Sequence, residues 1–169
     1  MNVKLISAAA LAAFGLAASI AQAATVTNTM PVKITIQNAC NVTTTAPTTL
    51  DFGTAGPLVA NVDNSSTITV TCTNLAPYTV GLDAGLNGGG VINARKMISG
   101  AATVGYQLYS DAARTLVWGF VTPVAGSGTA IAGTGNGTAQ ALTVYGRVPP
   151  QTTPAANVYT DTVAVTVTY

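Results

Sequence analysis

The feature that most constrains the fold of this chain is the alternation of apolar side chains with threonine and other small polar residues. A period of two residues is typical of β-strands with one buried face, because successive side chains of a strand point to opposite sides. The alternation recurs in the segments 66–73, 78–82, 104–109, 142–148 and 159–169. It is also marked in the segment 25–37, where one face carries Val26, Met30, Val32, Ile34 and Ile36.

These segments predict an all-β fold of about seven short strands separated by Gly, Pro and Asn turns, arranged as one β-sandwich domain. Threonine suits such strands because it is β-branched and keeps a solvated face polar without charge. The segment 111–115 predicts a turn, and 116–120 is expected to return as the hairpin partner of 104–109. The segment 126–137 is expected to be a glycine-rich loop.

The composition argues against most catalytic chemistry. The 169 residues include six Lys plus Arg and five Asp, with no Glu and no His. Without imidazole there is no Ser-His or Cys-His dyad, no His metal ligand and no base naturally poised near pH 7. A formal charge of +1 provides no basic field for nucleic acid. We therefore expect no enzyme activity, no cofactor, no metal and no nucleic-acid partner.

Residues 1–23 are expected to be a cleaved signal peptide. Lys4 supplies the positive n-region, the apolar run 5–20 follows, and Ala21-Gln22-Ala23 forms an A-x-A cleavage site. The alternative is a transmembrane anchor, but a run of about 16 residues is shorter than the roughly 20 that a span needs. Cleavage before Ala24 would remove Lys4 and leave equal numbers of positive and negative side chains. Near-zero charge favours self-association, and we expect no membrane insertion of the processed chain.

The two cysteines, Cys40 and Cys72, both follow the leader. Since disulfides are typical of exported proteins, the simplest expectation is a single bond between them. A metal-binding pair is a poor alternative, because the chain has no His and no C-x-x-C spacing.

Alternating segments at both ends of the processed chain leave two possibilities open. A long alternating strand with a free edge is hazardous unless something pairs with it. The segment 25–37 therefore either forms the first strand of its own sandwich or completes the sheet of another molecule by strand addition.

A set of residues in a fixed order resembles the spore coat protein U domain family, whose better-understood members are pilins of archaic chaperone–usher pili. The resemblance covers about residues 26–169, and Asn157 stands where the family commonly has Gly. The residues that carry it are Cys40-Asn41-Val42, Leu50-Asp51-Phe52-Gly53, Ile68-Thr69-Val70-Thr71-Cys72, Arg95-Lys96-Met97, Tyr106-Gln107-Leu108-Tyr109-Ser110-Asp111, Trp118-Gly119, Val144-Tyr145-Gly146-Arg147-Val148, Tyr159-Thr160-Asp161-Thr162-Val163 and Tyr169.

The resemblance implies an immunoglobulin-like β-sandwich that lacks one strand and is completed by donor-strand addition. A periplasmic chaperone would fill the gap first, and the N-terminal strand of the next subunit would replace it at the outer-membrane usher. Residues 24–37 would be the donor segment and residues 38–169 the pilin domain. Val26, Met30, Val32, Ile34 and Ile36 would insert, and Val163, Val165, Val167 and Tyr169 would line the acceptor side. Pro31 is awkward in such a strand because it has no N–H to donate.

Other local patterns have simpler explanations. Asp51-Phe52-Gly53 has the same sequence as a kinase motif, but we predict a turn here. The glycine-rich stretches lack the Lys-Ser/Thr of a phosphate-binding loop. Asp111 and Arg114 are expected to brace the hairpin turn. Asp161 would be catalytic only with a partner that the sequence does not supply. Trp118 could present a sugar-binding platform, although Trp in a sandwich is more often in the core.

The favoured hypothesis is a secreted, non-enzymatic pilin subunit that polymerises into a cell-surface fimbrium for adhesion and biofilm formation. A structural protein of a spore or cell coat is the alternative within the same class. A secreted carbohydrate-binding module or hydrolase is the alternative from a different class.

Overall fold

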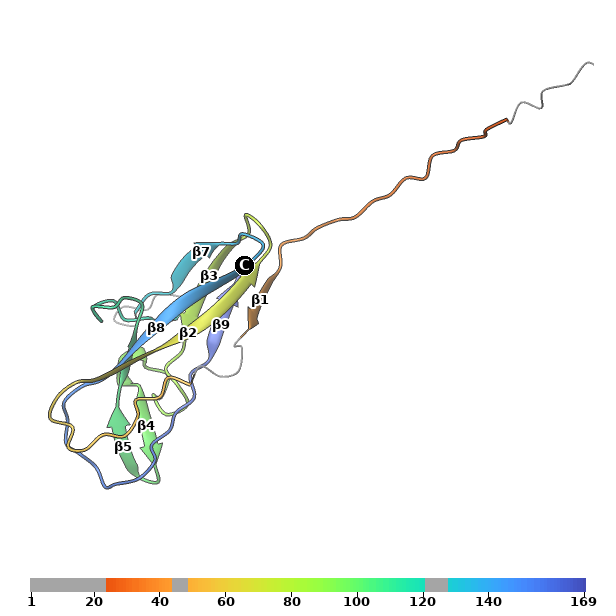
Figure 1. The fold of residues 1–169 in the computed structure, drawn as a ribbon. Helices are drawn as coiled ribbons and strands as arrows, with labels where there is room; N and C mark the ends of the chain where they lie inside the picture. Colours follow the sequence, from red (N-terminus) through yellow and green to blue (C-terminus); the bar gives the residue numbers. More distant parts are fainter. Residues whose placement is uncertain (1–23, 44–48, 121–127) are drawn as a thin grey trace, which may run out of the picture. The chain divides into compact units, whose positions relative to one another are not determined.

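A computed structural model describes residues 24–43, 49–120 and 128–169. It divides the chain into two units, residues 1–35 and residues 36–169, which we describe one at a time. The second unit contains the strands and one short 3-10 helix (Figure 1). Its elements are β1 (Cys40–Thr43), β2 (Val62–Cys72), β3 (Pro77–Leu82), η1 (Ile92–Ala94), β4 (Lys96–Ser99), β5 (Ala102–Gly105), β6 (Gln107–Tyr109), β7 (Ile131–Thr134), β8 (Ala139–Val148) and β9 (Val165–Thr168).

The strands form two main sheets and a separate hairpin. One sheet has the order β1-β2-β8-β6, the other has the order β7-β3-β9, and β4 pairs with β5. Every pair of neighbouring strands is antiparallel. The longest ladder joins β2 to β8, which lie side by side in Figure 1.

We name the two ends of this body by their contents. The disulfide end is where β2 finishes at Cys72 and β3 begins at Pro77. The hairpin end carries β4 and β5 and lies opposite the C-terminus in Figure 1. Because Thr168 pairs with Thr79 at the start of β3, β9 runs toward the disulfide end.

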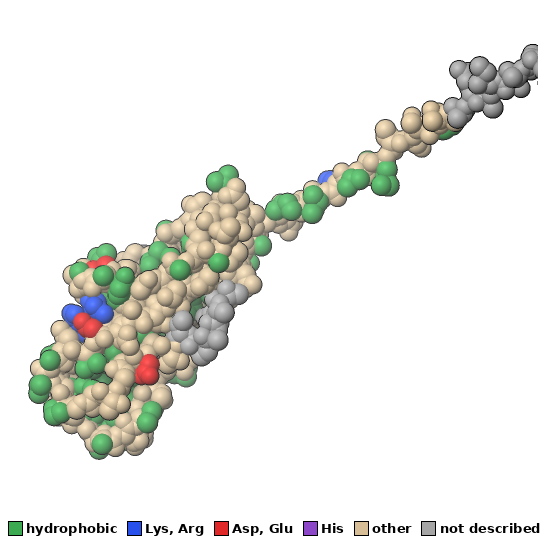
Figure 2. All heavy atoms as spheres, in the orientation of Figure 1, with side chains coloured by type: hydrophobic (Ala, Val, Ile, Leu, Met, Phe, Trp, Pro, Cys, Tyr) green, Lys and Arg blue, Asp and Glu red, His purple; other side chains and the backbone are tan. Residues whose placement is uncertain are grey.

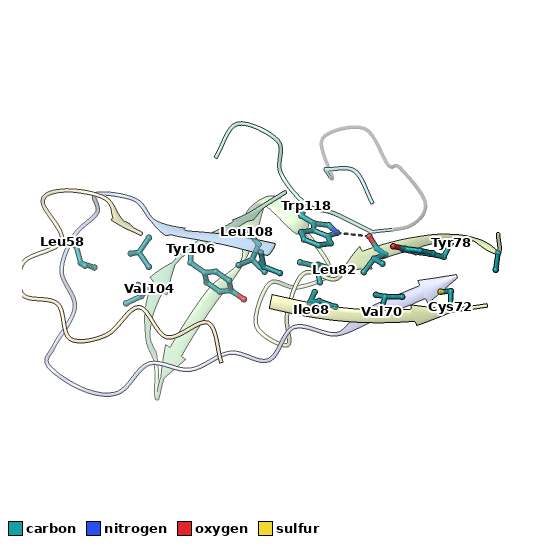
Figure 3. Close-up of a cluster of buried hydrophobic side chains, with 14 residues drawn as sticks. Leu58, Ile68, Val70, Cys72, Tyr78, Leu82, Val104, Tyr106, Leu108 and Trp118 are labelled. Carbon is teal, nitrogen blue, oxygen red and sulfur yellow. Dashed lines mark hydrogen bonds between the residues drawn. The ribbon is translucent and has the colours of Figure 1, made fainter. Parts of the chain in front are cut away.

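The core lies between the two main sheets and follows the predicted alternation. Ile68, Val70 and Cys72 of β2 are buried together with Val80 and Leu82 of β3 (Figure 3). Residues of β6 and β8 complete the same cluster. The prediction of an all-β, immunoglobulin-like sandwich is confirmed, and the described residues contain no α-helix. None of the helical structure in those residues is long and apolar enough to cross a membrane.

The segment 104–109 differs from the single strand that its alternation predicts. Val104 belongs to β5 and Leu108 to β6, and these strands lie in different sheets. Tyr106 sits between them, and its N–H donates to the carbonyl of Arg95, which continues the β4–β5 register by one bond before the chain passes to β8. All three side chains are buried, so the predicted alternation is confirmed. The prediction of one continuous strand is wrong.

Three further segments depart from expectation. The segment 116–120 returns antiparallel beside the end of β6, as predicted, because Ser110 donates to Leu116 and Trp118 donates to Leu108. It forms isolated bridges, Tyr109 with Val117 and Trp118 with Thr129, and not the strand that we predicted. The expected loop 126–137 contains β7, and its residues 126–127 lie outside the described residues. Of the segment 159–169, only β9 is a strand. Thr160 forms an isolated bridge with Ile98 of β4, and Thr162 and Ala164 accept from Leu86 and Asp83, which follow β3.

Candidate strand-exchange site

The N-terminal segment is described from residue 24 onward, and no residue from 24 to 39 is assigned to a strand. The alternation gives this segment one apolar and one polar face. A strand also requires a partner for its backbone N–H and C=O groups, and the segment has none. In this structure it is therefore not the first strand of its own sandwich. Its apolar side chains are exposed: Val26 by 95%, Met30 by 83%, Val32 by 86%, Ile34 by 82% and Ile36 by 70%.

The C-terminal strand β9 forms one edge of its sheet. It pairs with β3, and no strand in the described part of the chain pairs with its other side. Val163, Val165 and Val167 pack against the buried core but are only half-buried. Tyr169, which we also predicted here, is 60% exposed. The three valines therefore mark an edge where the core is incompletely covered.

Two backbone hydrogen bonds show which way the backbone groups of this edge point. The carbonyl of Ala164 accepts from the N–H of Asp83, and that of Thr162 accepts from the N–H of Leu86. Since a strand points alternate residues to opposite sides, the even-numbered residues face β3. Val163, Val165 and Val167 consequently direct their N–H and C=O groups to the open side. Leu82, the register partner of Val165, donates its own N–H away from β9, to Gly119.

The β1 strand is the corresponding edge of the other sheet. Cys40 and Val42 pack against the same core and are half-buried. The carbonyl of Cys72, opposite Cys40, accepts from Gly137 on the β8 side. Cys40 and Val42 therefore also direct their backbone groups away from β2, by the same parity argument. At both edges, half-buried apolar side chains belong to residues whose backbone groups are free to pair.

The predicted disulfide is confirmed between Cys40 and Cys72, 32 residues apart. It joins the first residue of β1 to the last residue of β2. The chain just before it is held by Thr73, whose N–H donates to the carbonyl of Ala39 at 2.9 Å. The Thr73 hydroxyl also donates to the carbonyl of Gln37 at 3.1 Å. The root of the N-terminal segment is thus fixed at the disulfide end.

We expect the change Cys72→Ser to lower the free energy of unfolding by about 3 kcal/mol, because the open chain gains the entropy of a 32-residue loop. Urea denaturation of the oxidised protein and of the variant measures the difference. Cys40→Ser should give the same loss, and the double change should cost no more than either one. Equal stability of wild type and variants would show that the bond does not stabilise the fold.

Two half-buried carboxylates, those of Asp83 and Asp161, fix the part of the chain that leads into β9. Asp83 Oδ1 accepts from the N–H of Ala164 at 2.8 Å. Asp161 Oδ2 accepts from the hydroxyl of Tyr106 at 2.7 Å, and its Oδ1 accepts from Asn87 Nδ2 at 2.9 Å. Burial, and then this bond to Asp161, raise the pKa of Tyr106 well above its ordinary value. These contacts give Asp161 a structural position, where the sequence left a catalytic role open.

Arg95 is a structural residue near the site that the sequence did not single out, since it entered only as part of the family resemblance. Its side chain is 2% exposed, and burial is the main reason that its pKa falls to about 10. The guanidinium donates to the carbonyls of Leu82, Asp83 and Trp118, and to Gln107 Oε1 at 2.7 Å. It therefore joins the end of β3, beside β9, to β6 and to the core tryptophan.

Trp118 is fully buried and donates its indole N–H to the carbonyl of Val80 at 2.9 Å (Figure 3). A buried ring offers no platform to a sugar, so the core interpretation of this residue is confirmed. The Asp51-Phe52-Gly53 segment is confirmed as a turn, in which the Gly53 N–H donates to Asp51 Oδ1.

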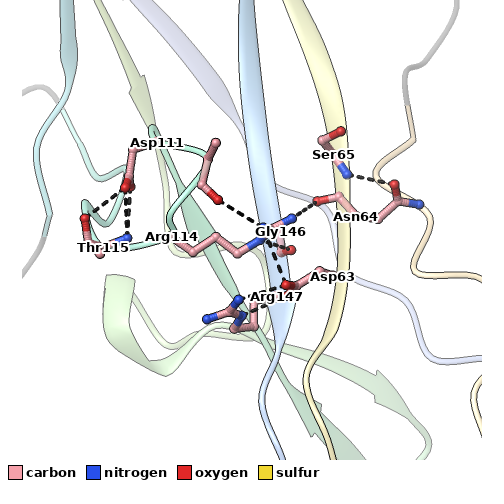
Figure 4. A network of polar contacts seen from close by, with 9 residues as sticks. Asp63, Asn64, Ser65, Asp111, Arg114, Thr115, Gly146 and Arg147 are labelled. Carbon is pink, nitrogen blue, oxygen red and sulfur yellow. Dashed lines mark hydrogen bonds and ion pairs between the residues drawn. The ribbon is translucent and has the colours of Figure 1, made fainter.

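Asp111 braces the hairpin turn as expected, but its side chain does not form an ion pair with Arg114. Asp111 accepts from the N–H and hydroxyl of Thr115, whereas Arg114 forms an ion pair with Asp63 at 3.4 Å (Figure 4). Arg147 also binds Asp63, at 2.8 Å, and this hydrogen bond is the main cause of the lowered pKa of the Asp63 carboxyl. On the face shown in Figure 2 few other side chains are charged. This cluster lies on the β2–β8 sheet, away from the β9 edge.

The open pockets in the described part of the molecule include two of about 480 and 350 Å³, and no Asp or Glu side chain lines either of these two. The described residues also contain no group of three potential metal ligands. The smaller pocket is lined mainly by apolar atoms and lies beside the end of β9, where Tyr169 contributes to its wall.

Comparison with known proteins places this geometry in a family. The sequence model of the Spore Coat Protein U domain matches residues 8–166, nearly the whole chain. The chain belongs to the Spore Coat Protein U domain family. The family inferred from the sequence alone is therefore confirmed. Protein U of Myxococcus xanthus is 34% identical over 176 residues, covering 96% of this chain and 93% of the relative.

The fold also resembles that of a solved pilus complex. It is the chaperone–tip adhesion subunit pre-assembly complex from archaic chaperone-usher Csu pili of Acinetobacter baumannii. The match has a TM-score of 0.53 and 21% identity, and it covers 80% of this chain. This chain spans only 40% of the matched chain in that complex.

Proposed function

We propose that this Spore Coat Protein U domain protein is a structural subunit that polymerises by donor-strand exchange into surface fibres. The observation that carries the proposal is the β9 edge. Its half-buried valines and its free backbone groups belong to the same residues, so one added strand would satisfy both. The exposed N-terminal segment has the matching chemistry, with apolar side chains at every second position from residue 30 to residue 36.

The proposed pathway includes further steps. Residues 1–23 direct export, and residues 24–37 form the donor segment of a pilin domain that spans residues 38–169. A periplasmic chaperone covers the β9 edge until an outer-membrane usher exchanges it for the donor segment of the next copy. The product is a secreted fimbrium that serves adhesion and biofilm formation. The solved pilus complex with the same fold contains a chaperone, which supports the first partner.

The absence of catalysis is part of the proposal. The buried Arg95 and the half-buried Asp83 and Asp161 make structural hydrogen bonds to neighbouring strands and loops. Family membership and the shared fold point to a structural role. A coat protein remains the second candidate, favoured by the 34% identity to Protein U.

Deletion of Thr25–Ile36 tests the exchange. We expect a subunit that still folds but yields no fibres when expressed in its own host, as measured by electron microscopy and by SDS-resistant oligomers. A sharper variant replaces Ile34 and Ile36 with Asp and should also abolish polymers, because both side chains would enter an apolar edge. The matched control replaces Lys33 and Thr35 with Asp, on the opposite face, and should polymerise.

Fibres of normal length from the deletion variant would contradict the exchange through this segment. The location of wild-type polymer separates the two structural candidates. A fimbrium should extend from the surface of growing cells, and the gene of its subunit should lie beside genes for a chaperone and an usher. A coat protein should instead be deposited on the spore or cell wall.

A further inference from the structure

The ladder between β3 and β9 continues past the last residue of β3, but with a side chain in place of a backbone group. The register of the two strands, in which Leu82 lies opposite Val165, places Asp83 opposite Ala164. The N–H of Asp83 donates to the carbonyl of Ala164 at 3.1 Å, as an antiparallel ladder requires. The same ladder would have the carbonyl of Asp83 accept from the N–H of Ala164. That N–H donates instead to Asp83 Oδ1 at 2.8 Å, so the carboxylate replaces the carbonyl as the partner of Ala164.

The buried Arg95 occupies the carbonyl that the ladder would have used. Its Nε and one of its terminal nitrogens donate to the carbonyl of Asp83 at 2.8 and 2.6 Å. The strand β3 ends one residue earlier, at Leu82. Without a substitute acceptor, the reciprocal pairing of β9 would therefore also end there.

A second pair of contacts carries the pairing further toward the hairpin end. The N–H of Leu86 donates to the carbonyl of Thr162 at 3.0 Å, so one residue more lies on this side than on the β9 side, as in a β-bulge. Gly85 lies within the bulge at a φ of +72°, and a side chain there would collide with the carboxylate of Asp161. The Gly85 N–H donates to Asp83 Oδ1 at 2.9 Å. The same oxygen of Asp83 therefore closes the bulge and holds the edge.

Val163 lies between the two residues that these bonds hold. Because Thr162 and Ala164 bond toward β3 and its following loop, the N–H and C=O of Val163 point to the open side. The Val163 side chain packs against the core. It thus offers one apolar position and two backbone hydrogen bonds, although β3 no longer runs beside it. The acceptor edge therefore begins at Val163, and the run 163–169 has the same length as the exposed run 30–36.

We propose that Asp83 is a positioning residue that extends the acceptor edge by one apolar position, at Val163, and so sets the length of donor segment that the edge binds. The inference rests on the proposed donor-strand function and adds a residue that determines how much of the donor is recognised. Without the carboxylate, the N–H of Ala164 loses its acceptor, because Arg95 still holds the carbonyl. The chain around Val163 then leaves the extended conformation for part of the time, and the apparent affinity for a donor falls with the population that remains competent. Loss of one hydrogen bond changes such an equilibrium by about tenfold.

Peptide binding tests the proposal on the protein exported from its full-length gene and refolded with its disulfide intact. A labelled peptide of residues 24–37 is titrated with protein, and fluorescence anisotropy gives the dissociation constant. We expect Asp83→Ala to bind this peptide about tenfold more weakly than the unmodified protein does. Asp83→Asn keeps an Oδ1 acceptor in the same place and should bind within about threefold of the unmodified protein. Asp111→Ala is the matched control and should leave binding unchanged, since Asp111 also accepts from backbone N–H groups, but within the turn 111–116.

Altered peptides show whether the effect is confined to the Val163 position. With the two runs aligned end to end, antiparallel insertion places Ile36 at Val163, and parallel insertion places Met30 there. On the unmodified protein, the peptide changes Ile36→Ala, Met30→Ala and Ile34→Ala should each weaken binding. On Asp83→Ala, the effect of either Ile36→Ala or Met30→Ala should shrink to less than about threefold, whereas the other two effects should persist. General destabilisation of the fold would not couple Asp83 to a single end of the peptide.

Hydrogen exchange measures the edge in the absence of peptide. The N–H of Leu86, which donates to Thr162, should exchange about tenfold faster in Asp83→Ala. The N–H of Gly81, within the regular ladder, should exchange at an unchanged rate. If Asp83→Ala does not fold, Asp83→Ser replaces it in every measurement. The serine oxygen lies one bond closer to the backbone, so it can close the local turn but does not reach Ala164.

The outcomes separate this inference from the proposed function. If no peptide binds to the unmodified protein, donor-strand exchange through residues 24–37 is wrong, and the role of Asp83 in it falls as well. If the unmodified protein and Asp83→Ala bind the wild-type peptide equally, exchange stands and the positioning role is wrong. The same conclusion follows if Asp83→Ala alters the effects of all three peptide changes alike or alters none of them. Unchanged exchange of the Leu86 N–H also overturns the positioning role.

Discussion

Replacing Arg95 with Met should lower the free energy of unfolding by about 3–5 kcal/mol. The guanidinium donates to three backbone carbonyls and to Gln107, and its removal leaves these acceptors in a buried region. Met preserves much of the side-chain volume, so the loss reports the hydrogen bonds rather than a cavity. Urea denaturation followed by circular dichroism measures it.

Two further variants make the Arg95 prediction specific. Arg95→Lys keeps the charge, but a single ammonium cannot reach acceptors on three elements, so an intermediate loss is expected. Lys96→Met removes a neighbouring exposed cation and should change stability by less than about 0.5 kcal/mol. If Arg95→Met were as stable as Lys96→Met, the buried guanidinium would contribute nothing to the fold.

Replacing Trp118 with Ala should cost about 3–5 kcal/mol, because the ring is fully buried between the sheets and its removal leaves a cavity. Trp118→Phe retains most of the apolar contact but leaves the Val80 carbonyl without the indole N–H. That change should cost about 1–3 kcal/mol. The chain has one Trp, so circular dichroism must replace Trp fluorescence in the unfolding measurement.

Leu116→Ala is the matched control, since this side chain lies two residues away and is 62% exposed. It should lower the free energy of unfolding by less than about 1 kcal/mol. A Trp118→Ala loss no larger than that of the control would contradict the core assignment. The double variant with Arg95→Met should be less than additive, because Arg95 donates to the Trp118 carbonyl.

Much of the sandwich could be predicted from side-chain periodicity. The alternation located β2, β3 and β8, and the expected leader together with the cysteine count indicated the bond from Cys40 to Cys72. Periodicity describes which side chains share a face, but it carries no information about the partner strand. β5 pairs with β4, whereas β6 pairs with β8. This change of pairing partner at Tyr106 could therefore not be detected from the alternation of the segment 104–109.

The candidate site was predictable only in part, for the same reason. The apolar faces of the N-terminal segment and of Val163, Val165 and Val167 could be read from alternate positions. Which backbone groups of β9 are free depends on bonds to Asp83 and Leu86, residues some 80 positions away in the chain. Arg95 gave no signal either, since nothing local distinguishes a buried arginine from the exposed cation beside it.

The Cys40–Cys72 bond has a mechanical consequence if the chain works in a fibre. A pull on the N-terminal segment enters the body at Ala39, next to the bond. The load then passes through a covalent bond into β2, so the short β1 strand is not peeled open first. From β2 it reaches the long antiparallel ladder with β8, where force along the strands shears many hydrogen bonds together. The cross-link thus converts a weak point of attachment into one that distributes tension.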